Sequence, residues 1–319
     1  MAHLVEQMAY VGEEPWHGLG NKLQPKQPIE IWARQAGMNF NILESPVRFM
    51  TEETGTLGAI HSYAENKVLY RSDTKAPLSV VSHKFRTVQP RHILEFYRDL
   101  TQASGYELET AGVLKGGKKF WALAKTGKSA ALKGNDVVNG YVLLATACDG
   151  TLATTAQFTS IRVVCNNTLS IALNNETGAV KVPHSTTFDP QAVKKQLGIA
   201  VSNWDEFMYR MKQLSERKVK SNEAMAYLLR VFADPVAGAT GLPNERAITK
   251  VQSLFDGQGK GAELASSKGT AFGLLQSVTQ YVDFEKRARS ADNRLDSAWF
   301  GQGAAVKQKA LEQAMLLAA

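Results

Sequence analysis

Short apolar stretches alternate with turn residues between about residue 61 and residue 183, and this alternation is typical of β-strands. One helical pattern, at 91–102, interrupts them. The expected strands cover 67–71, 78–81, 106–114, 118–125, 137–147, 152–159 and 161–172. The pattern predicts an α+β fold whose middle is a mainly antiparallel β region.

The period of the apolar positions changes to that of a helix after Asp189. Apolar residues are then spaced by four, three, four and three, at Leu197, Val201, Trp204, Met208 and Met211. This spacing predicts one long amphipathic helix. Glycine and proline breaks separate four further helical patterns, at 222–233, 244–255, 271–289 and 304–317.

The first 60 residues are rich in glycine and proline, and then show a short helical pattern at 29–36 and an extended one at 40–50. We therefore predict three consecutive parts. They are an N-terminal arm (1–60), a basic α+β domain (61–188) and a C-terminal helical region (189–319).

Composition restricts the classes of protein that fit. Of the 319 residues, 44% are hydrophobic, which is enough for one large core or several smaller ones. No uncharged apolar run reaches membrane-spanning length, and the first residues do not resemble a signal peptide, so we expect a cytoplasmic protein. The two cysteines, Cys148 and Cys165, have no metal-binding spacing and are expected to be buried. We predict no cofactor and no bound metal.

The positive charge is concentrated in one region. The net charge is +7, and residues 61–135 hold 13 Lys or Arg against 6 Asp or Glu, whereas the rest of the chain balances at 24 against 24. Six lysines and no acid lie within 111–135. A polyanion such as nucleic acid is the natural partner of such a region, although a lysine-rich surface without function has the same composition.

The sharpest pattern is a basic hairpin. Gly116-Gly117 between two apolar runs predicts a two-residue turn. Strand alternation then places Lys119 and Trp121 on one face. Single-strand binders combine lysines that follow the phosphates with a ring that stacks on a base. For Trp121, burial in the core is favoured over stacking on a base. The candidate residues of this hairpin are Lys115, Lys118, Lys119, Trp121, Lys125 and Lys128.

A second basic segment, Ser82–Gln89, contains Lys84 and Arg86 and is followed by Arg91 at an expected helix start. Arginines and helix N-termini are common phosphate contacts. His83 is also a candidate general base, but the sequence gives it no recognisable catalytic partner.

Arg162 belongs to a third segment, IRVVCNNTL, where it is either a phosphate ligand or one member of a buried ion pair. Two further motifs, Trp16-His17 between glycines and Trp299-Phe300 before Gly301, are interpreted as packed anchors, the second at a helix end.

Five ordered motifs together resemble a phage- and plasmid-borne family of unknown function. They are AYVGEEPWHGLG, VSHKFRTVQ, IRVVCNNTL, GTAFGLLQSVTQYVDF and SAWFGQGAAVKQKAL. The resemblance implies carriage on mobile elements, and therefore a role in DNA replication, recombination or counter-defence.

The leading hypothesis is a non-catalytic protein that binds single-stranded DNA, organised like the phage annealing recombinases. It is expected to form homo-oligomers, with 304–319 as the candidate interface. One alternative is a metal-dependent nucleic-acid enzyme that uses Asp136, Asp149 and Asp189. Another is a counter-defence protein that binds a host factor.

Overall fold

The computed structural model describes residues 5–12, 20–52, 58–164, 167–170, 179–202, 204–233 and 244–318. The chain forms two compact units, one made of 1–125, 142–157 and 179–197, the other of 126–141, 158–178 and 198–319. The units interleave along the chain, because strands β7, β8 and β9 each supply residues to both. Their borders do not coincide with residues 60 and 188.

The larger sheet has the strand order β10-β9-β8-β7-β6-β1-β2, with β11 paired to β9. The pairings β1–β6, β6–β7, β9–β10 and β9–β11 are antiparallel, and the short β2 pairs in parallel with β1. The predicted α+β class with a mainly antiparallel centre is confirmed. The strands are β1 (Val5–Val11), β2 (Asn21–Leu23), β6 (Glu107–Leu114), β7 (Lys119–Leu132), β8 (Asp136–Ala147), β9 (Thr154–Arg162), β10 (Asn167–Ser170) and β11 (Ala179–Val182).

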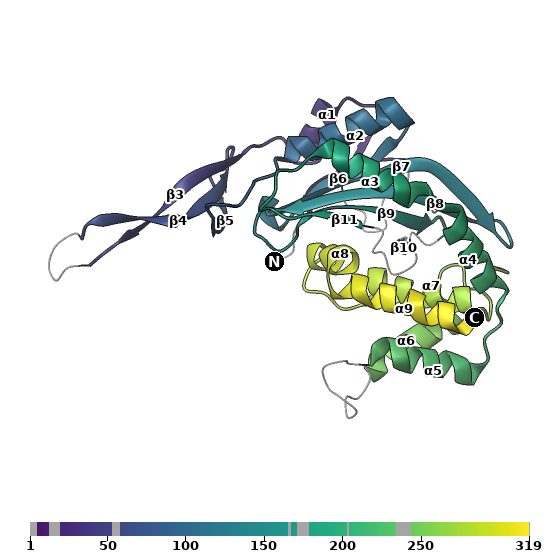
Figure 1. Cartoon of the computed structure of the whole chain (residues 1–319). Helices are drawn as coiled ribbons and strands as arrows, with labels where there is room; N and C mark the ends of the chain where they lie inside the picture. Colours follow the sequence, from purple (N-terminus) through teal and green to yellow (C-terminus); the bar gives the residue numbers. More distant parts are fainter. Residues whose placement is uncertain are drawn as a thin grey trace. The chain divides into compact units, whose positions relative to one another are not determined.

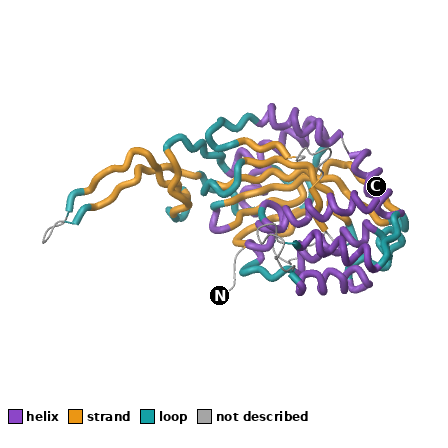
Figure 2. The backbone as a smooth tube through the Cα atoms, turned by 60° about the horizontal axis from the view of Figure 1, so that its bottom comes forward, coloured by secondary structure: helices purple, strands orange, loops and turns teal. Residues whose placement is uncertain are grey.

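A second sheet belongs entirely to the first unit and has the order β3-β4-β5. Its strands are β3 (Ile42–Met50), β4 (Ile60–Arg71) and β5 (Pro77–Ser82). The hairpin of β3 and β4 extends away from the rest of this unit (Figures 1 and 2). Strand β3 is exposed along most of its length, and β4 is exposed over its first half, residues 60–65.

Helices α1 (Ile29–Gln35) and α2 (Pro90–Ser104) pack against each other in the first unit, and α2 also packs on β6. One face of α2 buries Ile93, Leu94, Phe96 and Tyr97. The Tyr97 hydroxyl reaches the carbonyl oxygens of Ala122 (2.8 Å) and Val142 (2.9 Å). Burial raises the pKa of Tyr97 well above its usual range, so the hydroxyl stays neutral and ties the helix to the sheet.

The second unit is mainly helical. Its helices α7 and α9 lie side by side (Figure 1), and α9 also packs on α4, α5 and α8. Every residue of α7 is buried. The elements are α4 (Trp204–Glu216), α5 (Ser221–Phe232), α6 (Glu245–Ser253), η3 (Leu254–Gln258), α7 (Ala271–Gln280), η4 (Tyr281–Glu285), α8 (Ala291–Phe300) and α9 (Gln302–Ala318).

The expected helix through 197–211 is helical at every described position. Helix α3 (Pro190–Ser202) and helix α4 (Trp204–Glu216) cover it on either side of residue 203, which lies outside the described residues. Among the described residues, no helix is both long and apolar enough to cross a membrane.

Candidate nucleic-acid interface

Three of the predicted contact residues are buried, which corrects their assignment to a nucleic-acid surface. The exposed fractions are 3% for Lys119, 1% for Trp121 and 2% for Arg162. The cause for the first two is the position of β7 between β6 and β8, where residues 119–124 are buried on both faces. The alternative for Trp121, a place in the core, is confirmed.

The hairpin turn is longer than the predicted two residues. Leu114 and Lys119 form the last pair of β6 and β7, so residues 115–118 make the connection. Lys115, Gly116 and Gly117 all have positive φ, at 53°, 69° and 99°. Lys115 and Lys118 lie in this turn and are half-buried.

The turn is held by Arg71 of the second sheet. The Arg71 guanidinium lies 4.0 Å from the centre of the Phe40 ring and donates to the carbonyl of Gly116 at 3.4 Å. It also pairs with Asp73 at 2.7 Å, and this hydrogen bond lowers the pKa of Asp73 to about 2. Arg71 therefore acts as a structural cation.

The segment Ser82–Gln89, here called the basic segment, has a fixed backbone. His83 donates its N–H to the carbonyl of Glu65 (2.9 Å), and Arg86 donates its N–H to the carbonyl of His184 (2.6 Å). At the far end, the Gln89 amide makes two hydrogen bonds with the backbone of Ile42, at 2.8 and 3.1 Å. The contacts are all within the first unit and hold the loop in one conformation.

The charged side chains of the basic segment face solvent. Lys84 and Arg86 are exposed, and neither forms an ion pair with any described residue. Arg91, in contrast, is exposed but pairs with Glu95 at 2.8 Å. Of the remaining predicted lysines, Lys125 is half-buried and Lys128 is exposed.

His184 completes this site. It lies 98 residues from Arg86 in the sequence, so no local pattern predicts the contact. Its ring stacks on Phe85, with centroids 4.2 Å apart and planes 19° apart. Its Nδ1 lies 3.1 Å from the carbonyl oxygen of Arg86, and its Nε2 lies 3.0 Å from that of Leu152. Phe85, between Lys84 and Arg86, is thus a half-buried ring held in place by a second ring.

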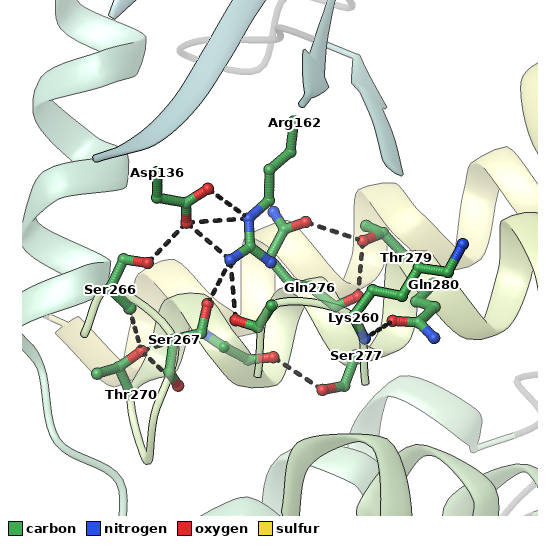
Figure 3. A network of polar contacts seen from close by, with 12 residues as sticks. Asp136, Arg162, Lys260, Ser266, Ser267, Thr270, Gln276, Ser277, Thr279 and Gln280 are labelled. Atoms are coloured by element: carbon green, nitrogen blue, oxygen red, sulfur yellow. Dashed lines mark hydrogen bonds and ion pairs between the residues drawn. The ribbon is translucent and has the colours of Figure 1, made fainter. Parts of the chain in front are cut away.

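Arg162 is a member of a buried ion pair, one of the two interpretations of its motif (Figure 3). Its Nε lies 2.8 and 2.9 Å from the two carboxylate oxygens of Asp136. Its Nη2 donates to Ser267 (2.8 Å) and to the carbonyl of Gly261 (3.1 Å), and Ser266 donates to Asp136 (2.6 Å). The guanidinium has no surface left for a phosphate.

A second buried network joins three of the sequence motifs in the same unit. Lys307 donates to Asp283 and to the Thr168 hydroxyl, both at 2.7 Å, and the Thr168 N–H donates to Asp283 at 2.9 Å. Thr168 belongs to the motif IRVVCNNTL, Asp283 to GTAFGLLQSVTQYVDF, and Lys307 to the motif that ends in VKQKAL. These motifs therefore meet in a packed network.

The three acids proposed as metal ligands each have local partners instead. Asp136 binds Arg162. Asp149 accepts from Thr151, and Asp189 accepts N–H groups at the start of α3. Within the described ranges, no group of three or more His, Cys, Asp or Glu has metal-binding geometry.

Cys148 is buried, as expected, and burial raises the pKa of its thiol to about 12. The reactive thiolate is therefore scarce near neutral pH.

Trp299 and Phe300 end α8 before Gly301, as predicted. The predictions for Trp16, His17, Cys165 and Asn166 fall outside the described residues.

A family model described as "Domain of unknown function (DUF932)" matches residues 77–299. The match covers more than half of the chain, so the protein belongs to this family. A comparison with curated proteins finds no match.

Proposed function

We propose that this member of the DUF932 family is a non-catalytic, cytoplasmic, nucleic-acid-binding protein of phages or plasmids, with single-stranded DNA as its favoured ligand in recombination or replication. The observation that carries the proposal is the basic segment, whose exposed Lys84 and Arg86 have no acidic partner among the described residues. Cations of this kind bind phosphates without first breaking an ion pair.

The geometry of the segment supports a preference for single strands. Phe85 lies between the two cations, and its ring is already oriented by stacking on His184. Ring stacking on an unpaired base contributes about 1–3 kcal/mol per base and does not depend on sequence. In this proposal Phe85 takes the stacking role first assigned to Trp121. Lys115 and Lys118 provide further positive charge in the same unit.

Salt-dependent binding tests the proposal. Fluorescence anisotropy with labelled single- and double-stranded DNA, over a salt series, should show tighter binding to the single strand. Because each lost phosphate contact removes about 0.7 from the slope of log affinity against log salt, replacing Lys84 and Arg86 together by Ala should reduce it by about 1.4.

Lys195 provides the matched control, since it is an exposed lysine on α3 that forms no ion pair with a described residue. Lys195→Ala should leave the slope unchanged. An absence of binding by the wild-type protein, or an unchanged slope in a folded double variant, would contradict the proposal.

A further inference from the structure

The end of the β3–β4 hairpin is a two-stranded ribbon, here called the distal ribbon (residues 47–52 and 59–63). The register of the hairpin shifts between the pair Pro46–Lys67 and the pair Val47–Tyr63. Strand β5 pairs with β4 only over residues 66–70. Beyond the shift, the two strands therefore pair only with each other among the residues that the structure describes.

Large apolar side chains are exposed on the distal ribbon. The exposed fractions are 50% for Phe49, 56% for Met50, 67% for Ile60 and 48% for Tyr63. A two-stranded ribbon is marginally stable alone in water, and a cluster of exposed apolar side chains marks an interaction surface. These features of the distal ribbon are typical of a surface that a partner covers.

The free edge of β3 is suited to pairing with another strand. Thr51 donates its N–H to the carbonyl of Ala59 at 3.1 Å, so odd-numbered residues of β3 direct their backbone groups toward β4. Even-numbered residues direct theirs to the free edge, because β3 is the outer strand of its sheet. Pro46 has no N–H to offer there, which limits edge pairing to the residues beyond it.

We propose that two copies of the chain associate through the distal ribbon, with the β3 edges antiparallel about a two-fold axis at Met50. In this register Arg48 of each copy lies opposite Glu52 of the other, so the pairing is complementary in charge. The outward-facing backbone groups at 48, 50 and 52 then form hydrogen-bonded pairs across the axis.

The same register brings together two of these apolar side chains, Met50 and Ile60, from both copies. Ile60 pairs with Met50 across the hairpin, and cross-strand partners share a face of the sheet. Two copies therefore place Ile60, Met50 and their two counterparts in one continuous row. Arg48 and Glu52 lie on this same face, because successive residues alternate between faces, and flank the row as ion pairs.

Charge reversal in the full-length protein tests this interface. Sedimentation velocity at low salt, without nucleic acid, should show a dimer of the wild-type chain. Arg48→Glu alone, or Glu52→Arg alone, places like charges opposite each other at two positions and should weaken association about tenfold or more. The double variant R48E/E52R restores opposite charges, so its dissociation constant should return to within about threefold of the wild-type value.

The control is Lys195→Glu, which changes an exposed charge outside the distal ribbon and should leave association unchanged. A monomeric wild-type protein, single reversals that associate normally, or a double variant that fails to recover would each overturn the proposal. Because no nucleic acid is present, these outcomes are independent of those for DNA binding.

Discussion

At the scale of single residues, burial and contacts decide which of the roles predicted from the sequence a side chain has. Arg162 and Arg86 are equally plausible phosphate ligands in the sequence. Arg162 is 2% exposed and bound to Asp136, whereas Arg86 is exposed and has no ion-pair partner in the described chain. A buried guanidinium must be compensated locally, because leaving it without a counter-charge is costly.

Replacing Asp136 by Ala should therefore lower the free energy of unfolding by about 3–5 kcal/mol, since Arg162 would keep its charge without a carboxylate. Urea denaturation followed by circular dichroism measures this change. The matched control is Asp73→Ala, which breaks an Asp–Arg pair whose carboxylate is 41% exposed. Because solvent screens the Asp73 carboxylate, its loss should cost less than that of Asp136, about 1 kcal/mol. Equal effects of the two substitutions would show that the buried Asp136–Arg162 pair does not stabilise the fold more than the Asp73–Arg71 pair.

At the scale of secondary-structure elements, the hydrophobic period predicts the type of most elements but not their surroundings. The patterns at 91–102 and 29–36 correspond to α2 and α1, whose apolar faces are clear in the sequence. The alternation of residues along β7 predicted one face with exposed lysines. Residues 119–124 are instead buried on both faces, because β7 is a central strand. The sequence predicted only the end of α8, at Trp299-Phe300, and it did not predict β1, β2 or β11, which are short.

The candidate site was predictable only in part, for a related reason. Lys84 and Arg86 lie in a recognisable basic stretch, but His184 and Leu152, which orient it, are distant in sequence. Local patterns carry no information on such tertiary contacts. The burial of Lys119 likewise follows from strand order, which the period of a single strand does not encode.

The turn between β6 and β7 allows a test at this scale, because its two glycines differ in their surroundings. A Cβ at Gly117 would lie 3.0 Å from a nitrogen of Arg71 and 3.2 Å from the Phe40 ring, at a φ of +99°. A Cβ at Gly116, at a φ of +69°, would meet nothing within 4 Å. We expect Gly116→Ala to cost about 1–2 kcal/mol, from its left-handed conformation alone.

Gly117→Ala should cost at least about 1 kcal/mol more, because crowding against Arg71 and Phe40 adds to the backbone strain. Thermal and urea unfolding of the two variants, measured side by side, give this difference. Equal stability of the two variants would contradict the close packing of Gly117.

At the scale of the whole molecule, the two proposed binding surfaces and the two buried ionic networks lie in different units. The basic segment and the distal ribbon lie in the first unit, and the two buried ionic networks lie in the second. The family match begins at Pro77, so it includes the basic segment but not the distal ribbon. The proposed DNA-binding surface thus lies within the family domain, and the proposed dimer contact lies outside it.

The last prediction concerns helix α9 at the C-terminal end. Its packing in the structure changes the expected effect of deleting it. As an oligomer interface, residues 304–319 would be removable without loss of the fold. In the structure, however, Lys307, Ala310, Leu311 and Ala314 of α9 are buried. The Tyr227 hydroxyl donates to the carbonyl of Ala310 at 2.9 Å, and Lys307 neutralises Asp283.

Deleting 304–319 should consequently unfold the second unit rather than separate folded protomers, because it exposes the apolar faces that pack on α9 and leaves Asp283 buried without its counter-charge. Circular dichroism should show loss of helix beyond the deleted residues, and the thermal transition should lose its cooperativity. Leu316→Ser is the control on the same helix, since Leu316 is 64% exposed and its replacement should change stability by less than about 0.5 kcal/mol. A truncated protein that keeps a cooperative transition and only falls in mass would instead establish α9 as the contact between copies.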